Sequence, residues 1–324
     1  MTLKDARFAL TDDGPEWSVR QSLANVWPRL IGNEGRISTR AVTQRFAGPG
    51  RELRKLASGG AVRWAHMSRA TVVRNARKRL RNPSTFKQDS TDLCGPFALL
   101  FEFARREPTR YVKALAELLD HGTFSTIGGH TFVAEDDLRA LPAVAIPQAD
   151  WLLAATIRDE ENLIQDVEDG EGWEGFTWPT EIVAWIEQLL GLRGTLHNVY
   201  HTGEMEAMRA AQRAIDAGGV AIVLIDSDMI HDGGTTHRES PVWWQRRNLP
   251  AAAGSGWGAR KHAQDDNDAI PGHYIVLLGG VRGTDEDESL DFSMRAWSFG
   301  FEYEVTGSAE GAAEYIYWVL TGEP

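Results

Sequence analysis

Residues 88–106 read QDSTDLCGPFALLFEFARR, and the prediction of the fold starts from this stretch. Its apolar run has helical length and follows three side chains of the types that cap helices, Ser90, Thr91 and Asp92. The sequence therefore predicts a helix whose first turn contains Cys94, the only cysteine in the chain. In a first helical turn, backbone N–H groups outside the hydrogen-bond ladder and the helix dipole favour an anion, so they would stabilise a thiolate.

The neighbours of Cys94 suit a thiol that reacts with a carbonyl group. Gly95 leaves room beside the sulfur, and the missing N–H of Pro96 costs no hydrogen bond in a first turn. Gln88, six residues upstream, can donate its amide hydrogen to the oxyanion that forms when sulfur attacks a carbonyl carbon. The alternative interpretation is a buried cysteine that acts only as a small apolar side chain.

The order of the other predicted elements indicates an α+β fold, with helices first and an antiparallel sheet afterwards. Predicted helices, most of them bounded by a proline or a glycine, cover residues 108–122, 149–158, 179–191 and 204–219. Predicted strands cover residues 220–226, 273–281, 293–305 and 314–322.

Composition narrows the class of protein. The 324 residues are 42% hydrophobic and 25% charged, which is typical of a globular protein and excludes a collagen-like or disordered chain. A single cysteine excludes an intrachain disulfide and a cysteine-rich metal cage. The start of the chain carries acids where a signal peptide needs an apolar run, and no stretch has the length of a membrane span. We therefore expect a soluble chain made in the cytoplasm, with any secretion through a specialised system.

The net charge of −12 combines two regions of opposite sign. Residues 1–87 hold 18 Lys and Arg against 6 Asp and Glu, a local charge of +12, and the remainder holds 16 against 40, a charge of −24. We predict a basic, partly helical segment over residues 1–85, used for delivery or docking, and a catalytic domain over residues 86–324. Helices are expected near residues 15–30 and 61–81 of the basic segment.

The densest basic cluster has near-helical spacing and consists of Arg74, Arg77, Lys78, Arg79 and Arg81. It could meet phosphate, an acidic partner or the acidic part of the same chain. No aromatic residues are interleaved with it, so a solvated or internally neutralised helix face is the favoured interpretation. Neither a nucleic acid nor a membrane is predicted as a partner.

His273 is the best placed of the nine histidines to act as a base for the thiol, because it opens the strand-like run HYIVLLGGV. If that strand turns back through the acidic loop that follows it, Ser298 falls opposite its start and can orient the imidazole ring. Asp291 would lie roughly 20 Å away along the strand. Asp226 and Asp228, at the end of another predicted strand, are alternative partners of the ring.

Two weaker signals complete the set of candidate residues. His197 and His201 stand four residues apart, but no third ligand is evident and no metal site is predicted. Trp243, Trp244 and Trp257 flank a glycine-rich loop, where they would either cover the core or line a substrate cleft.

The combination of Gln88, the Cys94–Gly95 pair and a distant Gly-His-Tyr-Ile-Val-Leu strand resembles the papain-like cysteine peptidase superfamily, especially the leader-peptidase domains of bacteriocin exporters. Over most of residues 86–320, the order of segments is also similar to that of bacterial papain-fold effectors and toxins. The resemblance implies a helical part that carries the nucleophile, packed on an antiparallel sheet that carries the histidine.

The resemblance implies that Cys94 is the nucleophile, His273 the general base and Gln88 the oxyanion donor. The chain departs from the family where papain-like enzymes place Asn or Asp to orient the histidine, because its AWSFG segment offers Trp297 and Ser298 there. Catalysis by Cys and His alone, a substituted orienting residue and a weakened enzyme all stay open.

The expected activity is that of a cysteine-dependent hydrolase, a protease or a glutamine or asparagine deamidase, that acts on a protein or peptide without a cofactor. Its expected setting is that of a secreted effector or toxin, which implies a cognate immunity protein. The alternatives are a catalytically weak or inactive binding module with this fold and a transglutaminase-type acyl transferase.

Overall fold

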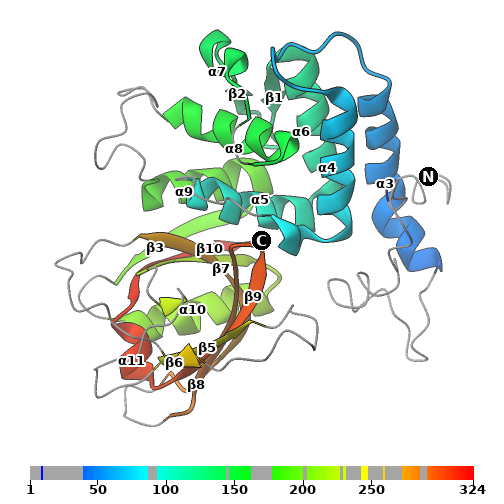
Figure 1. The fold of residues 1–324 in the computed structure, drawn as a ribbon. Coiled ribbons are helices and arrows are strands. Elements are labelled where there is room, and N and C mark those ends of the chain that lie inside the picture. The colour runs from blue at the N-terminus through cyan, green and yellow to red at the C-terminus, as the bar shows by residue number, and fades with distance from the viewer. Residues whose placement is uncertain are drawn as a thin grey trace. The chain divides into compact units, whose positions relative to one another are not determined.

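The computed structural model describes residues 9, 39–86, 93–143, 146–161, 177–199, 203–226, 229–230, 242–246, 258–259, 272–284 and 290–324 (Figure 1). The chain divides into two compact units, Met1–Phe176 and Thr177–Pro324. Within the described residues, no helix is both long and apolar enough to cross a bilayer.

The first unit is built mainly of helices. Its elements are α3 (Thr39–Ala57), α4 (Arg69–Arg81), the single 3-10 turn η2 (Pro83–Thr85), α5 (Cys94–Arg106), α6 (Pro108–His121), β1 (Thr123–Ser125), β2 (Thr131–Val133), α7 (Asp136–Ala140) and α8 (Gln148–Glu161). α3 packs against α6, and both α4 and α5 pack against α8. β1 and β2 form a small antiparallel pair whose inward rings, Phe124 and Phe132, stack at 4.9 Å between centroids.

Helix α5 is buried along most of its length. All ten residues of 95–104 are buried, including Glu102, whose carboxylate pairs with Arg105 and Arg106 at the end of the helix. The next helix, α6, begins at Pro108 and ends at Gly122, whose φ of 76° is left-handed and whose N–H donates to Leu118 O at 2.8 Å. Both predicted helix ends are therefore confirmed.

The described residues of the second unit form an antiparallel sheet and several helical elements. The strands are β3 (Arg193–Asn198), β4 (Val220–Ile225), β5 (Val242–Arg246), β6 (Gly258–Ala259), β7 (His273–Arg282), β8 (Phe292–Ser298), β9 (Phe301–Gly307) and β10 (Ile316–Glu323). The helical elements are α9 (Pro179–Trp185), the π-helix η4 (Ile186–Leu190), α10 (Glu204–Asp216) and α11 (Ala309–Ala313).

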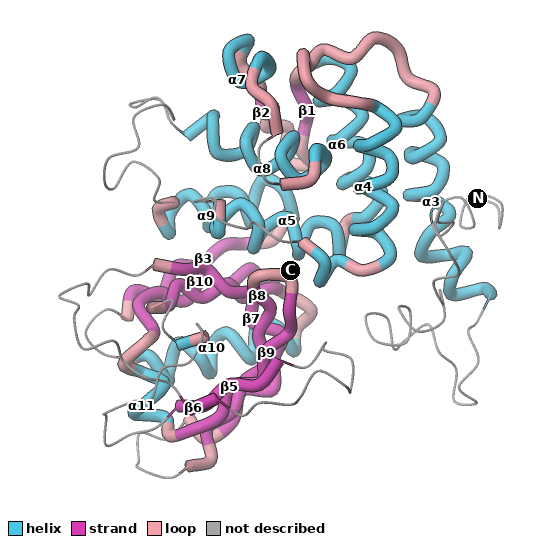
Figure 2. The backbone as a smooth tube through the Cα atoms, viewed as in Figure 1, coloured by secondary structure: helices cyan, strands magenta, loops and turns pink. Residues whose placement is uncertain are grey.

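The strands of the second unit gather in one sheet (Figure 2). Their order is β3-β10-β4-β7-β8-β9-β5-β6, and every neighbouring pair is antiparallel. Helix α10 packs on β4, β7 and β10. Met205 and Met208 of this helix are buried in one core with Val223 of β4 and Ile275 of β7. Side chains alternate between the two faces along a strand, and Val223 and Ile275 lie on the same face of the sheet. α9 packs against β3 and β10. The α+β class predicted from the sequence is thus confirmed.

The predicted strand over residues 293–305 is wrong in one respect, because it is a hairpin and not a single strand. β8 and β9 are joined by a two-residue turn, and Ser298 pairs with Phe301 across it. Both turn residues have left-handed backbones, with φ of 46° at Phe299 and 83° at Gly300. Such a turn matches the twist of antiparallel strands, but phenylalanine is an unusual residue for it, which is why the pattern resembled a continuous strand.

The boundary between the two units lies at residues 176/177, whereas the charge of the chain changes sign near residue 87. α3 and α4, which carry much of the basic charge, belong to the same unit as α5. Charge and packing therefore divide this chain at different places. In the basic cluster, Arg79 and Arg81 are buried, and Arg79 forms an ion pair with Asp150, so the cluster is internally neutralised at that position.

A glycine lets α10 run directly into β4. A Cβ placed on Gly219 would lie 2.0 Å from Gly322 O and 2.8 Å from Ala214 O, so only glycine fits between the helix end and β10. We therefore expect Gly219→Ala to lower the free energy of unfolding by roughly 1–3 kcal/mol, because backbone atoms must move apart. Urea denaturation measures the effect.

The matched control is Ala217→Ser, a substitution at an exposed residue two positions away, which should change stability by less than about 0.5 kcal/mol. Equal stability of the Gly219→Ala protein and the wild type would contradict this account of the α10–β4 passage.

Candidate functional site

The candidate residues from the sequence belong to different units. Cys94 lies in the first unit, and His273 and Ser298 lie in the second. Gln88, Asp228, His201 and Trp257 lie outside the described residues.

Cys94 is the first residue of α5, as the sequence predicts. The N-cap is Leu93, and not one of the polar residues expected there, which lie outside the described residues. The first hydrogen bond of the helix joins Phe97 N–H to Leu93 O at 2.9 Å. Cys94 is half-buried, whereas Gly95 and Pro96 are buried behind it. The thiol therefore sits in the first turn of the buried helix α5, with backbone N–H groups of that turn around it.

His273 opens β7, a central strand that lies between β4 and β8. Its side chain is 3% exposed, and its Nε2 lies 2.5 Å from Ser298 Oγ. Val276 pairs with Trp297, so the same register places Ser298 two residues along from His273 on the same face of the sheet. The register argument from the sequence is therefore confirmed for this contact.

Phe299 is a contact of His273 that the sequence analysis missed. The two rings stack face to face, with centroids 4.1 Å apart and planes inclined by 6°. A left-handed conformation costs a residue with a side chain roughly 1–2 kcal/mol. A stacked ring pair contributes about 0.5–1.5 kcal/mol, so the contact offsets much of the strain at Phe299. A Phe-Gly pair between two apolar runs was the available signal for this turn.

Tyr274, the next residue along β7, fixes the other face of the strand. Its Oη donates a hydrogen bond to Thr177 O at 2.7 Å, just before α9 begins. Trp178 follows, 54% exposed, with its N–H donating to Glu181 Oε2 at 2.8 Å. Because successive side chains of a strand point to opposite faces, the start of β7 is held from both sides.

The aspartates considered as partners of His273 lie as follows. Asp291 lies beside Gly283, at the end of the β7–β8 hairpin that is far from His273, as predicted. Gly283 is ten residues beyond His273 in the sequence. Asp226 follows β4, and its N–H donates to Tyr315 O at 2.9 Å. The side-chain contact of His273 Nε2 is with Ser298 Oγ.

The tryptophans and the second histidine group lie elsewhere in the second unit. Trp243 and Trp244 belong to β5, which β8 and β9 separate from β7 in the sheet. His197 lies in the edge strand β3, where Nε2 is 3.3 Å from Thr321 Oγ1 and burial lowers its pKa. Across the described residues, no group of three or more His, Cys, Asp or Glu side chains is placed to hold a metal ion.

Comparison with protein-family models, with curated proteins and with solved structures finds no match to this chain.

The contact between His273 and Ser298 predicts the tautomer of the ring. We expect the hydrogen on Nε2, donated to Ser298 Oγ, with the lone pair on Nδ1. Long-range ¹H–¹⁵N correlation spectra of the folded protein distinguish the two tautomers. Ser298→Ala should remove the preference and lower stability by roughly 1–3 kcal/mol, because a buried ring nitrogen loses its partner.

Ser308→Ala is a suitable control, because it removes a buried serine that caps α11 by accepting from Gly311 N–H at 3.0 Å. It should leave the His273 spectrum unchanged. A hydrogen on Nδ1 in the wild type would mean that Ser298 donates the bond.

Proposed function

We propose that this chain is a cysteine-dependent hydrolase of the papain-like type, with Cys94 as nucleophile and His273 as general base. The observation that carries the proposal is the His273 ring, held through Nε2 by Ser298 and through its face by Phe299. A structural histidine needs one hydrogen bond, whereas a general base also needs a fixed ring direction. The proposal rests on the surroundings of each residue within its own unit.

The chemistry assigned to the two residues is acyl transfer. Nδ1 of His273 accepts the proton of the Cys94 thiol, and the first turn of α5 stabilises the thiolate. Sulfur attacks the carbonyl carbon of an amide, and the oxyanion takes hydrogen bonds from Cys94 N–H and the Gln88 amide. His273 then gives its proton to the leaving amine or ammonia, and water hydrolyses the thioester.

The proposed substrate is an amide of a protein or peptide. Cleavage of a peptide bond makes the enzyme a protease, attack on a Gln or Asn side chain makes it a deamidase, and capture of the thioester by an amine makes it a transglutaminase-type transferase. We place the activity in a secreted effector or toxin with a cognate immunity protein, and the basic segment, residues 1–85, in docking to a delivery component. This setting follows from the resemblance of the sequence.

A second candidate function is a binding module that keeps the fold without turnover. It is favoured by the 3% exposure of His273 and by a serine hydroxyl at the place where an amide or carboxylate would orient the ring more strongly. Cys94→Ala separates the two, because it removes all modification of a substrate by an enzyme and leaves partner binding by a module unchanged.

The thiol of Cys94 should react as a thiolate near neutral pH. We expect iodoacetamide to label the folded protein with an apparent thiol pKa below the ordinary value of about 8.5. His273→Gln should return the profile toward that value, and His197→Gln, a substitution in the same unit, should leave it unchanged. If the wild-type thiol labels with the ordinary pKa, or does not label at all, the assignment of Cys94 as nucleophile is wrong.

The class of reaction should be visible in the intact mass of candidate target proteins after incubation with the enzyme. A gain of about one dalton indicates deamidation, fragments indicate proteolysis and a larger adduct indicates acyl transfer. The Cys94→Ser protein serves as the control and should change none of these masses. Equal modification by both proteins would contradict a cysteine mechanism.

A further inference from the structure

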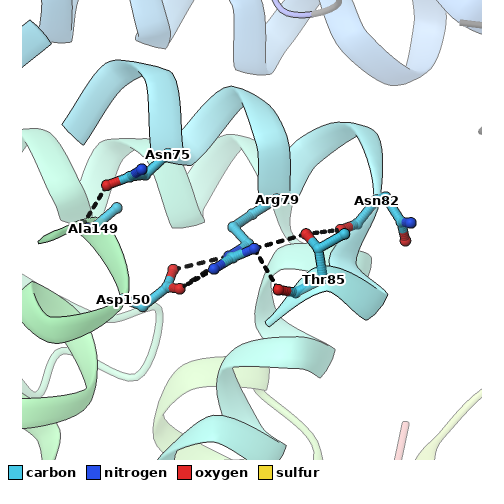
Figure 3. A network of polar contacts seen from close by, with 6 residues as sticks. All are labelled: Asn75, Arg79, Asn82, Thr85, Ala149 and Asp150. Atoms are coloured by element: carbon cyan, nitrogen blue, oxygen red, sulfur yellow. Dashed lines mark hydrogen bonds and ion pairs between the residues drawn. The ribbon is translucent and has the colours of Figure 1, made fainter. Parts of the chain in front are cut away.

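A buried arginine and aspartate join two helices of the first unit. Arg79 of α4 is 1% exposed and Asp150 of α8 is fully buried. Arg79 Nε lies 3.1 Å from Oδ1 and 3.0 Å from Oδ2 of Asp150, and Nη2 forms an ion pair with the same carboxylate (Figure 3). Beside this pair, Ala149 N–H donates to Asn75 Oδ1 at 3.5 Å. The contact between α4 and α8 is therefore fixed by a buried charge pair.

The same guanidinium holds a third piece of chain. Nη1 donates to Thr85 O at 2.5 Å and to Thr85 Oγ1 at 2.7 Å, and Thr85 Oγ1 donates to Asn82 O at 2.7 Å (Figure 3). The carbon of the guanidinium lies 4.8 Å from the centre of the Phe86 ring. Neutralising Asp150 alone would need none of these contacts, so Arg79 also fixes residues 82–86.

The segment that Arg79 holds contacts the helix that begins at Cys94. Phe86 is fully buried, and its ring meets that of Phe97 edge-on, with centroids 6.1 Å apart and planes at 90°. Phe97 lies in the first turn of α5, three residues after Cys94. Phe86 packs in the same way on Tyr111 of α6. The segment that Arg79 holds is therefore packed, through Phe86, against the first turn of the helix that begins at Cys94.

We infer that Arg79, held by Asp150, is a positioning residue for the nucleophile: it fixes residues 82–86, whose Phe86 ring packs against Phe97 in the first turn of α5. The inference rests on the proposed function. Arg79 touches no reacting atom and acts through Thr85 and Phe86.

Lysine cannot take the place of Arg79. A guanidinium has five donors in a planar fork and reaches a carboxylate on one side and Thr85 on the other, whereas an ammonium is a single point charge. Arg79→Lys therefore keeps the charge opposite Asp150 and loses the hold on residues 82–86.

A second variant separates positioning from charge burial. Burial raises the pKa of Asp150, and Arg79 counteracts that effect, so removing only Arg79 would leave an unpaired buried carboxyl group. The double variant Arg79→Met/Asp150→Leu removes both charges with side chains of similar size, an exchange that often keeps or raises stability. It stays folded and lacks the contacts to Thr85.

The chain offers a matched control on the same helix. Arg69 of α4 also divides its guanidinium between an aspartate and backbone carbonyls, with 2.5 Å to Asp120 Oδ1, 2.9 Å to Leu56 O and 2.7 Å to Gly60 O. None of these partners of Arg69 belongs to residues 82–86, the segment that Arg79 holds. Arg69→Lys therefore reproduces the chemical change without touching residues 82–86.

The experiment measures two properties of the full chain under conditions where circular dichroism shows each protein folded. The first is the rate of Cys94 labelling by iodoacetamide against pH. The second is hydrogen exchange in peptides that span residues 82–97. We expect Arg79→Lys and the double variant to label about tenfold more slowly at pH 6, as for a thiol pKa raised by about one unit, and to exchange faster in these peptides. Arg69→Lys should match the wild type in both.

Each outcome decides one point. If the wild type labels as an activated thiolate and the two Arg79 variants do so as well, the inference is wrong and the proposed function stands. If Arg69→Lys slows labelling as much as Arg79→Lys, the effect is general destabilisation and the inference is again overturned. If the wild-type thiol itself is ordinary, the proposed function fails, and the inference fails with it.

Discussion

A buried guanidinium must find acceptors for its donors and a partner for its charge, and in the first unit Arg79 finds both. This requirement brings three stretches of chain together: α4, the start of α8 and residues 82–86. Isolated in a low-dielectric interior, either charge of the Arg79–Asp150 pair would cost several kcal/mol, so neither helix can shift without the other. The buried helix α5, with Cys94 at its first residue, is packed against this arrangement through Phe97 and α8.

In the second unit, a polar side chain is held in place by a turn and not by an ion pair. The hairpin between β8 and β9 requires two left-handed residues, and one of them is Phe299. Its ring lies on His273, while Ser298, at the last position of β8, holds the Nε2 of the same imidazole. One tight turn therefore sets both the direction and the face of the ring, and Tyr274 secures the strand from the opposite side.

Much of this arrangement follows from local patterns in the sequence. The start of α5 at Cys94, the limits of α6 and the contact between His273 and Ser298 were predictable, because they depend on helix termini and strand register. The Arg79–Asp150 pair joins residues 71 positions apart, and the spacing of five basic residues does not reveal which of them is buried. The turn at Phe299 was missed because it opposes the ordinary preference of phenylalanine, and the ring's contact with the imidazole is a tertiary interaction that local patterns do not show.

The position of β10 has a consequence for the timing of folding. This strand, residues 316–323, lies between β3 and β4, two strands that precede it by about a hundred residues or more. While the chain is being synthesised, no strand joins β3 to β4 until residues 316–323 have been made. The strands β4, β7 and β8 are neighbours in the sheet and all precede β10, so the part of the sheet that holds His273 and Ser298 has its strands available earlier. The sheet of this unit therefore assembles in a fixed order, with β10 joining β3 to the other strands last.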